Sequence, residues 1–202
     1  MTEEEHGGAF RKDLTHLSWE EVYARQAKRA PLIGEWMEAL RLKAGDHVLD
    51  IGAGPGYVSL TLAERVGAGG VVYAVDQSAE ALAYLARLQQ ERGVSHIQRI
   101  HADAATLEPA GRRIDAGLVT MVLHHAETPA VIVGNLARLL APGAMAVVAE
   151  FHPEAPCAVG PPQAHRLSPE QVRAWCEGAG LNKLLYRRQT SEHYMLLVHR
   201  PA

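Results

Sequence analysis

The chain has 202 residues, of which 48% are hydrophobic and 21% are charged, and its net charge is −3. This composition is enough for one hydrophobic core in a single compact unit. The weak negative charge provides no sequence-wide attraction to nucleic acid, so we expect no nucleic-acid partner. No apolar run reaches the roughly 18 residues of a membrane span, and the acidic start lacks the pattern of a signal peptide. We therefore expect a soluble, cytoplasmic protein.

The beginning of the chain is predicted to form a helical cap over residues 1–40, followed by the main domain over residues 41–202. Helical patterns cover residues 14–40 and are broken at Pro31, because proline disfavours a helix interior. The cap and the main domain are expected to form one compact unit.

A buried strand, a glycine-rich turn and a helix follow one another at residues 48–66. The apolar run 48–51 is typical of a parallel strand that is buried on both faces. Glycines in the turn 52–56 let the backbone bend sharply and approach a ligand, because they carry no Cβ. Apolar residues then recur at the spacing of one helical face over residues 57–66. This order predicts a loop for a nucleotide-containing ligand.

The spacing of the glycines favours one kind of ligand. The dinucleotide pattern G-x-G-x-x-G would need a third glycine at Tyr57, but it falls one residue earlier, at Gly56. No Gly-Lys-Ser/Thr follows, so the turn is not a P-loop. What remains is D-x-G-x-G-x-G, which begins at Asp50. A carboxylate there repels a pyrophosphate and attracts a sulfonium or ammonium group. The alternative is that Asp50 only caps the turn.

Acidic residues also follow the next two predicted strands. The strand 71–75 ends at Asp76, whose carboxylate can accept hydrogen bonds from both hydroxyls of a ribose. A helix N-cap role for Asp76 is compatible with this binding, and a dinucleotide fold also places an acid at this position. The strand 97–101 is followed by Asp103, which is alternatively a solvated loop residue.

The remaining segments complete a doubly wound α/β sheet. We predict a strand over residues 115–123, a helix over 129–140, a strand over 144–151 and a helix opened by Ser168 and Pro169. The last two strands, 182–188 and 192–199, are separated by a link too short for a parallel crossover, so they form an antiparallel hairpin. The predicted fold is a seven-stranded, mostly parallel, Rossmann-like sheet with an antiparallel C-terminal hairpin.

The motif at Asp50 and this strand order resemble the class I S-adenosylmethionine-dependent methyltransferases, over roughly residues 31–202. The resemblance implies that the cofactor is S-adenosyl-L-methionine and that its product is S-adenosyl-L-homocysteine. In the family, the acid after the third strand faces the adenine amino group, and the loop after the fourth strand lies beside the transferable methyl group. The implied cofactor-binding residues are Asp50, Gly52, Ala53, Gly54, Gly56, Tyr57, Asp76, Gln77, Asp103, Ala104, Thr120 and Met121.

Three short segments resemble the branch that contains the quinone-ring C-methyltransferases of ubiquinone and menaquinone biosynthesis and many uncharacterised small-molecule methyltransferases. These segments are residues 124–129, 139–143 and 165–168. The link 152–167 has no obvious helical insertion to enclose a large prenylated ring, which argues against a quinone substrate. We expect a small-molecule acceptor and either a monomer or a homodimer. The loop 160–166, with two prolines, is expected to be ordered over the acceptor.

In relatives the N-terminal segment lies over the cofactor, where aromatic side chains can shield the sulfonium or stack on the substrate. The aromatic residues here are Trp19, Tyr23 and Trp36. The alternative, which the sequence supports equally, is that these aromatic residues pack against the edge of the sheet.

Methyl transfer is an in-line displacement, so alignment of the reactants accounts for much of the acceleration. A general base is needed only where the acceptor must lose a proton. The candidate catalytic residues are His124, His125 and His165, with His152 as a further candidate. The alternative is that each histidine is a loop residue bonded to backbone or water.

Three other functions stay open. A metalloid methyltransferase would use His152, Cys157, His165 and Cys176, but their spacing matches no compact ligand pattern, and we predict no bound metal. An NAD-dependent oxidoreductase would share Asp76 but contradicts the glycine spacing. A non-catalytic, cofactor-binding scaffold would be expected to lose the acids at 50, 76 and 103, all of which are present.

Overall fold

The computed structural model describes residues 17–108, 111 and 113–202. Residues 1–16, and with them the start of the predicted helical pattern at Leu14, lie outside the described part. Seven strands form one sheet in the order β3-β2-β1-β4-β5-β7-β6. The strands are β1 (His47–Ile51), β2 (Val71–Asp76), β3 (Ile97–His101), β4 (Ala116–Thr120), β5 (Met145–Phe151), β6 (Asn182–Arg188) and β7 (His193–His199).

In the described part of the chain, six α-helices and three short 3₁₀ turns accompany the strands, and two of the α-helices precede the first strand. The α-helices are α1 (Trp19–Ala27), α2 (Ala30–Ala39), α3 (Tyr57–Val66), α4 (Ala79–Arg92), α5 (Pro129–Leu139) and α6 (Pro169–Gly178). The 3₁₀ turns are η1 (Ala104–Thr106), η2 (Leu123–His125) and η3 (Gln163–His165). Within the described residues, no helix is both long and apolar enough to cross a bilayer.

The pairing of the strands confirms the predicted fold class. Strands β1 to β5 pair in parallel, whereas β7 runs antiparallel to both β5 and β6. The last two strands therefore form the predicted hairpin, and β7 is the one reversed strand of the sheet.

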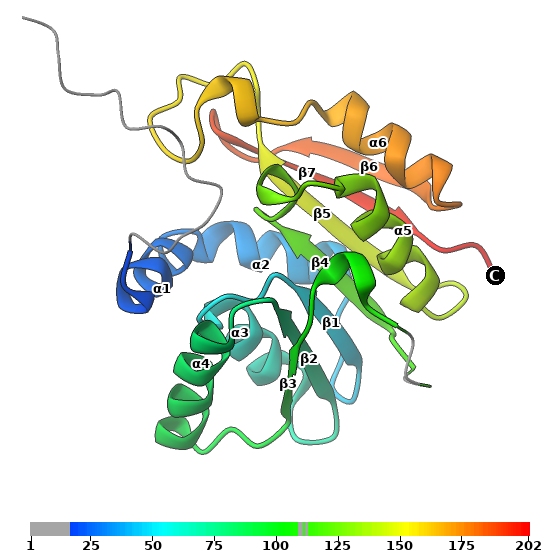
Figure 1. Cartoon of the computed structure of the whole chain (residues 1–202). Coiled ribbons are helices and arrows are strands. Elements are labelled where there is room, and N and C mark those ends of the chain that lie inside the picture. Colours follow the sequence, from blue (N-terminus) through cyan, green and yellow to red (C-terminus); the bar gives the residue numbers. More distant parts are fainter. Residues whose placement is uncertain (1–16, 109–110, 112) are drawn as a thin grey trace, which may run out of the picture.

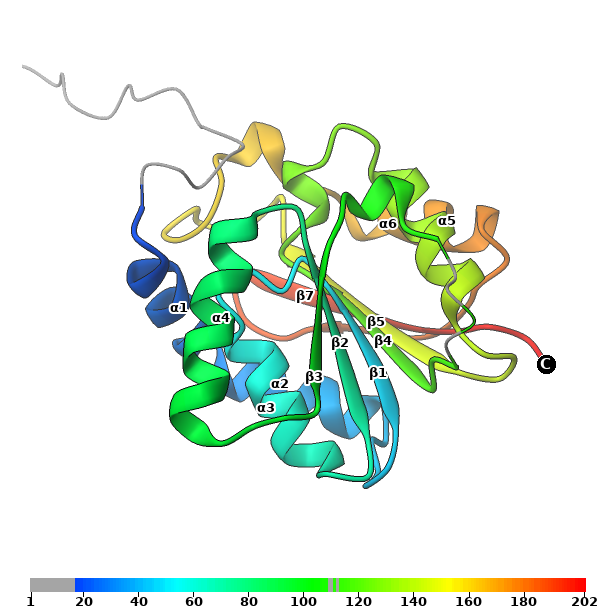
Figure 2. The same ribbon diagram turned by 60° about the horizontal axis from the view of Figure 1, so that its bottom comes forward.

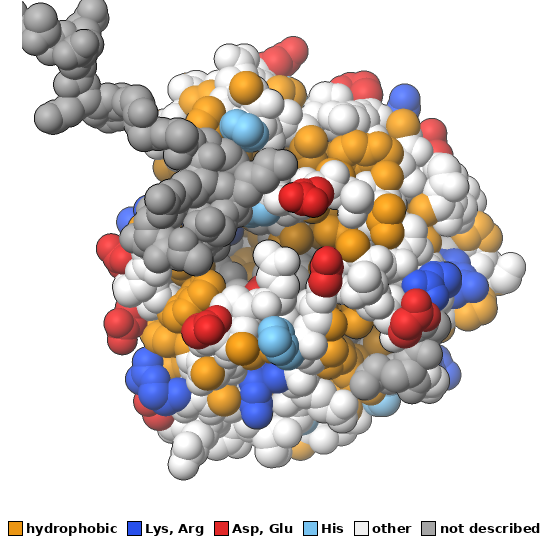
Figure 3. Space-filling view, viewed as in Figure 1, with side chains coloured by type: hydrophobic (Ala, Val, Ile, Leu, Met, Phe, Trp, Pro, Cys, Tyr) orange, Lys and Arg blue, Asp and Glu red, His pale blue; other side chains and the backbone are white. Residues whose placement is uncertain are grey.

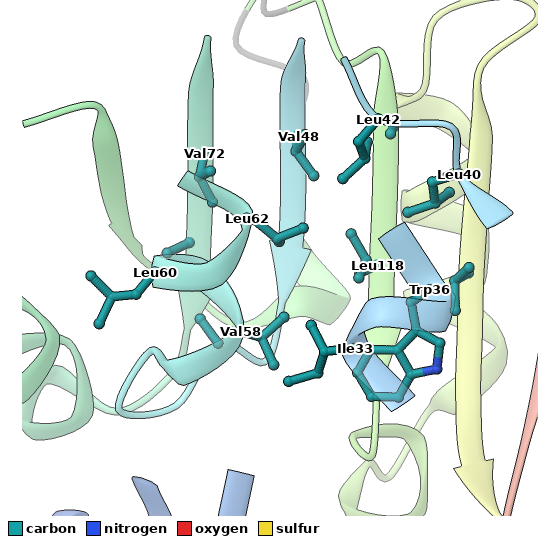
Figure 4. Packing of buried hydrophobic residues seen from close by; sticks show 14 of the residues in the cluster. Ile33, Trp36, Leu40, Leu42, Val48, Val58, Leu60, Leu62, Val72 and Leu118 are labelled. Carbon is teal, nitrogen blue, oxygen red and sulfur yellow. The ribbon is translucent and has the colours of Figure 1, made fainter. Parts of the chain in front are cut away.

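Helices cover both faces of the sheet, which explains the apolar strands. Figure 2 shows α1 to α4 on one side and α5 and α6 on the other, and Figure 1 shows the same layers along the strands. Successive strand residues alternate between the two cores, so Val48 packs in one and Leu49 in the other. Figure 4 shows Ile33 and Trp36 of α2 beside Leu118 of β4, in the core that α3 also covers.

Polar side chains cap the starts of α1 and α6, and the start at Ser168 was predicted from the sequence. Ser18 and Glu21 form a reciprocal capping box at the start of α1, each side chain accepting the other residue's backbone N–H. Ser168 caps α6 by accepting the N–H of Gln171, and Pro169 occupies the first turn. Tyr57–Val66 is a helix as predicted.

One strand boundary was predicted wrongly. The strand expected over residues 115–123 covers only Ala116–Thr120. Met121 adopts a left-handed conformation (φ 57°), and its N–H bonds to the carbonyl of Ala149 on β5. The chain then turns into η2, which carries His124 and His125. The apolar residues 121–123 gave the appearance of a continuing strand, although the backbone has already bent away from the sheet.

The order of the strands fixes the place of the ligand site. The chain runs outward from β1 through β2 to β3, and then from β4 through β5 on the other side. In open α/β sheets the ligand binds outside the carboxyl ends of the strands, where the order reverses. Here that point lies between β1 and β4, beside the glycine turn.

The close packing of β4 against α5 gives a test of the fold. A Cβ at Gly117 would lie 2.6 Å from Leu136 Cδ1 and 3.2 Å from Leu140 Cδ2. We expect Gly117→Ala to lower the free energy of unfolding by about 1–3 kcal/mol, because the helix must move away from the sheet. Urea denaturation measures the difference.

Gly134→Ala is the matched control, because Gly134 lies within α5 and a Cβ there meets nothing within 4 Å. It should stabilise the protein by about 0.5–1 kcal/mol, since alanine favours a helix more than glycine does. A Gly117→Ala protein as stable as the wild type would contradict the described packing.

Candidate active site

The glycine turn after β1 has a shape that only glycine accepts at two positions. Gly52 and Gly56 have φ values of 76° and 90°. A Cβ at Gly52 would lie 2.2 Å from Val122 Cγ2, in the loop after β4. A Cβ at Gly56 would lie 2.3 Å from Leu85 of α4. The turn is therefore packed closely between the loop after β4 and α4, as expected for a backbone that approaches a ligand.

The carboxylate of Asp76 connects the ends of β1 and β2. Its Oδ2 accepts the N–H of Gly54 at 2.7 Å, and its Oδ1 accepts the N–H of Ser78 at 2.9 Å. An ionised carboxylate has about four acceptor positions, so these bonds do not use its full acceptor capacity. Burial raises the pKa of Asp76, although the backbone N–H groups of Ser78, Gly54 and Gln77 oppose that rise.

Asp50 lies beneath the turn and is almost completely buried, with 1% of its surface exposed. Its Oδ2 accepts the hydroxyl of Ser59, on α3, at 2.6 Å. Burial raises the pKa of Asp50 to about 6, the Ser59 hydroxyl opposes this rise, and the carboxylate of Asp76 adds to it. The Asp50 carboxylate therefore lacks solvation, and a nearby cation would compensate for this.

The side chain of Gln26, on α1, is bonded to the turn from the opposite side. Its Nε2 donates to the carbonyl of Ala53 at 3.1 Å, and its Oε1 accepts the N–H of Tyr57 at 3.0 Å. The amide of Gln26 thus supplies hydrogen-bond partners for two backbone groups, the carbonyl of Ala53 in the turn and the N–H of Tyr57 at the start of α3. Tyr57 is one of the predicted cofactor-binding residues, and its backbone N–H is bonded to Gln26.

The other predicted cofactor residues line the same edge of the sheet. Asp103 is exposed and its Oδ1 accepts the N–H of Ala105, which makes it the cap of η1. Ala104 is held by α5, because the Asn135 amide donates to its carbonyl at 2.8 Å. Gln77 is exposed, Thr120 ends β4 and is half-buried, and Met121 follows it and is buried. These residues all lie at or just beyond the carboxyl ends of β2, β3 and β4.

A carboxylate and a histidine form a buried pair at the ends of β4 and β5. Glu150 is fully buried, and its Oε2 lies 2.7 Å from Nδ1 of His124. Its Oε1 accepts the backbone N–H of His124 at 3.3 Å. Burial acts to raise the pKa of Glu150, but the charge and hydrogen bond of His124, together with backbone N–H groups, hold it below its usual range.

This pair fixes the tautomer of His124. An ionised carboxylate only accepts hydrogen bonds, so Nδ1 of His124 carries a proton. In the neutral ring the lone pair is therefore on Nε2, which is the arrangement of a general base oriented by an acid. The His124 side chain is 3% exposed, so bulk water is largely excluded from it.

The other candidate histidines lie in different surroundings. The ring of His125 is half-buried and its centroid is 4.1 Å from that of His124. His165 lies on η3, in the link after β5. His152 accepts the N–H of Glu154 at Nδ1 and packs edge-on against Tyr194. The structure therefore brings His124 and His125 together at the end of β4, and gives a carboxylate partner to His124.

The link 152–167 is held in place by one buried arginine. Arg166 bonds to Glu192 Oε2 at 2.7 Å and donates to the carbonyls of three link residues. These carbonyls belong to His152, Val159 and Pro161. The link contains only the single turn η3, so it lacks a helical insertion as predicted.

The N-terminal aromatics have separate roles. Trp36 is 1% exposed, packs in the core against the sheet and donates to Gln189 at 2.8 Å. Tyr23 packs edge-on against Tyr57 at the start of α3, with ring centroids 5.2 Å apart. Trp36 therefore packs against the sheet, which was the alternative to a place over the cofactor, whereas Tyr23 lies next to the glycine turn.

The two cysteines lie in different surroundings. Cys176 is on the buried face of α6, where burial raises the pKa of its thiol to about 12, while Cys157 is exposed. Among the residues that the structure describes, no group of three or more His, Cys, Asp or Glu side chains is arranged to hold a metal ion.

A model of the methyltransferase domain family matches residues 48–143, the segment from β1 to the turn before β5. Over 111 residues the chain is 34% identical to the 2-phytyl-1,4-naphtoquinone methyltransferase of Trichormus variabilis, covering 54% of this chain and 48% of that protein. The chain thus spans about half the length of the curated relatives it matches.

Solved structures share the fold at low sequence identity. A SAM dependent methyltransferase from Aquifex aeolicus matches with a TM-score of 0.80 at 20% identity, covering 91% of this chain and 98% of that one. The N-methyltransferase NodS from Bradyrhizobium japonicum WM9, in complex with S-adenosyl-L-homocysteine, matches with a TM-score of 0.64 at 18% identity, covering 94% and 91%.

The burial of Asp50 predicts a pH-dependent stability. The folded pKa of about 6 lies above the ordinary value of 3.8, so the folded state binds more protons and the free energy of unfolding falls as pH rises from about 4 to 6. Asp50→Asn keeps an acceptor for Ser59 and removes the charge. We expect it to be more stable than the wild type by about 1–3 kcal/mol at pH 7.5, with the difference shrinking towards pH 4.5.

Urea denaturation at several pH values measures this difference. Glu64→Gln is the control, because it removes the charge of a carboxylate that is exposed on α3. A constant difference between Asp50→Asn and the wild type across the range would show that Asp50 does not titrate abnormally.

Proposed function

Because the chain belongs to the class I superfamily of S-adenosylmethionine-dependent methyltransferases, we propose that it transfers a methyl group from S-adenosylmethionine to a small-molecule acceptor. The observation that carries the proposal is the pairing of Asp76 with the glycine turn. One carboxylate sets the shape of the turn and keeps acceptor positions for a ribose. The matched family segment 48–143 contains this pair.

The residues at the sheet edge fit this cofactor. The Gly52 and Gly56 positions leave no room for a side chain, so the turn presents backbone to a ligand. Asp76 would hold the two ribose hydroxyls, and Asp103 would accept the adenine amino group. Asp50, desolvated beneath the turn, favours a cation and disfavours a pyrophosphate. NodS, a structural neighbour, binds the demethylated product of this cofactor.

The acceptor is proposed to lie at the carboxyl ends of β4 and β5. S-adenosylmethionine supplies there a methyl group that is activated by the sulfonium. His124 would take the proton of the acceptor at Nε2 as the acceptor atom bonds to the methyl carbon, and the bond from that carbon to the cofactor sulfur would break with its electron pair left on sulfur. Glu150 keeps the proton of His124 on Nδ1 and stabilises the imidazolium that forms. The acceptor therefore carries a proton on the atom that is methylated.

The partners and location follow from the same class of function. We propose that the protein acts in the cytoplasm, as a monomer or homodimer, on small molecules and without nucleic acid. On the face seen in Figure 3, Lys and Arg side chains of the described residues gather in small separate groups, with no continuous basic stripe. This distribution disfavours the phosphate contacts that dominate nucleic-acid binding.

Cofactor binding tests the proposal directly. We expect calorimetry to detect binding of S-adenosylmethionine and S-adenosylhomocysteine, and none of NAD. Asp76→Ala should weaken the binding of S-adenosylhomocysteine by at least about tenfold, because it removes charge-assisted hydrogen bonds to the ribose. Circular dichroism checks that the variant folds.

Glu64→Ala is the control, since Glu64 is exposed and lies on α3 away from the turn. Binding of NAD alone would refute the proposed function. Unchanged affinity in Asp76→Ala would refute the ribose assignment.

The role of Glu150 can be separated from a structural role by the pH profile. The acceptor is first found by transfer of labelled methyl groups into a fractionated metabolite extract. We expect Glu150→Gln to lower kcat by about 10- to 100-fold and to displace the pH dependence of kcat, because the imidazolium of His124 loses its carboxylate partner.

Binding of S-adenosylhomocysteine should stay unchanged in Glu150→Gln, and His124→Gln should remove the pH dependence. If both variants keep the wild-type kcat and pH profile, then the pair does not act as a base and the acceptor loses no proton to it.

A further inference from the structure

Arg29 is a half-buried cation whose guanidinium has no hydrogen bond or ion pair within the described residues. Its guanidinium carbon lies 5.7 Å from the centroid of the Phe151 ring, at the end of β5. The described part of the chain offers its N–H groups no hydrogen-bond acceptor and no ion pair. Burial lowers the pKa of Arg29, Glu150 opposes this and Arg25 adds to it. A guanidinium has five N–H donors, so a buried one without acceptors is costly unless a ligand supplies them.

His193, at the start of β7, holds a second donor without a partner. Thr190 Oγ1 accepts the backbone N–H groups of Glu192 and His193, at 3.0 and 3.1 Å, so its own proton goes to Nδ1 of His193, 2.9 Å away. The ring proton of His193 is therefore on Nε2. That nitrogen is buried and has no partner in the described residues.

The two donors meet at the same aromatic ring. Phe151 pairs with His193 across β5 and β7, and their ring centroids are 4.8 Å apart. Burial, and then the charge of Arg29, lowers the pKa of His193 to about 4, so His193 donates as a neutral ring. Arg166 also lies over Phe151, but its donors are already taken by Glu192 and by carbonyls of the link.

Arg29 and His193 lie near β5 and β7, whereas the glycine turn follows β1, on the other side of β4 in the strand order. Strands β4 and β5 separate β1, which carries the turn, from β7. Neighbouring strands are about 4.8 Å apart, so β7 starts roughly 14 Å across the sheet from β1. The base His124 lies between them, with its ring edge-on to Phe151 at 5.4 Å.

We propose that Arg29 and His193 bind a carboxylate of the methyl acceptor, which is thus a small organic acid with a second, proton-bearing nucleophilic group. This inference rests on the proposed function. A carboxylate has two oxygens, which fit one donor from the guanidinium and one from the imidazole. Bound there, the acid places its other group on the His124 side of Phe151.

Benzoate, as a simple carboxylate, and its neutral analogue benzamide test the site. Calorimetry is done on the full chain saturated with S-adenosylhomocysteine. We expect benzoate to bind with at least about tenfold higher affinity than benzamide, because a carboxylate accepts charge-assisted hydrogen bonds that a neutral amide does not. Arg29→Gln and His193→Phe should each remove that preference.

Arg87→Gln is the matched control. Arg87 also lies over an aromatic ring, 4.7 Å from the centroid of Tyr84, but it is exposed and ion-paired on α4. It should leave benzoate binding unchanged. Arg29→Gln alters a half-buried residue, so it remains informative even if His193→Phe fails to fold.

Three results would overturn the inference: no saturable benzoate binding to the wild-type complex, no preference for benzoate over benzamide, or equal benzoate binding by Arg29→Gln. A loss of S-adenosylhomocysteine binding in Arg29→Gln, with binding of 5′-methylthioadenosine unchanged, would assign Arg29 to the cofactor carboxylate and also overturn it. If S-adenosylhomocysteine does not bind at all, the proposed function fails, and the same benzoate comparison on the cofactor-free protein decides the anion site separately.

Discussion

The hydrogen bond from the Gly54 N–H to the Asp76 carboxylate holds the glycine turn in its position at the carboxyl edge of the sheet. Parallel strands end at one edge of the sheet, but nothing in the strand ladder fixes how the loops beyond that edge are arranged. Asp76, at the end of β2, accepts the N–H of Gly54 in the turn after β1 and the N–H of Ser78 at the start of α4. One side chain thus ties the turn to two neighbouring elements. The acid that would bind the ribose is also the acid that forms the turn.

Two histidines at the other side of the site show how their partners decide their chemistry. His124 gives its Nδ1 proton to Glu150, so its Nε2 is free to accept a proton. His193 accepts at Nδ1 from Thr190, so its Nε2 carries a proton and donates. The two rings face the same phenylalanine, at centroid distances of 5.4 and 4.8 Å. As neutral rings, the two histidines therefore differ at Nε2, which carries a lone pair in His124 and a proton in His193.

The sequence predicted well what depends on neighbours along the chain, such as the glycine turn, the caps and the apolar strands. The end of β4 was missed because apolar residues continue past the left-handed turn at Met121. Glu150 and Gln26 were missed because their partners are 26 and 31 positions away in the sequence. An acid inside the apolar run of β5 was the available signal for Glu150, since a buried carboxylate needs a partner. Arg29 gives no comparable signal, because exposed arginines are common in helix connections.

The charges along the sheet edge divide the site into two halves of opposite character. Asp50, Asp76 and Asp103 lie at the ends of β1 to β3, where burial makes the first two carboxylates favour a cationic ligand. Arg29 and the histidines lie around the ends of β4 and β5 and the start of β7, where Glu150 already pairs with His124 and the donors of Arg29 and His193 are left for an anion. Under the proposed function, a sulfonium donor would be attracted to the acidic half and an acidic acceptor to these donors. The reacting methyl group would lie at the boundary between β1 and β4, where the two fields meet, so electrostatics as well as shape would align the two substrates.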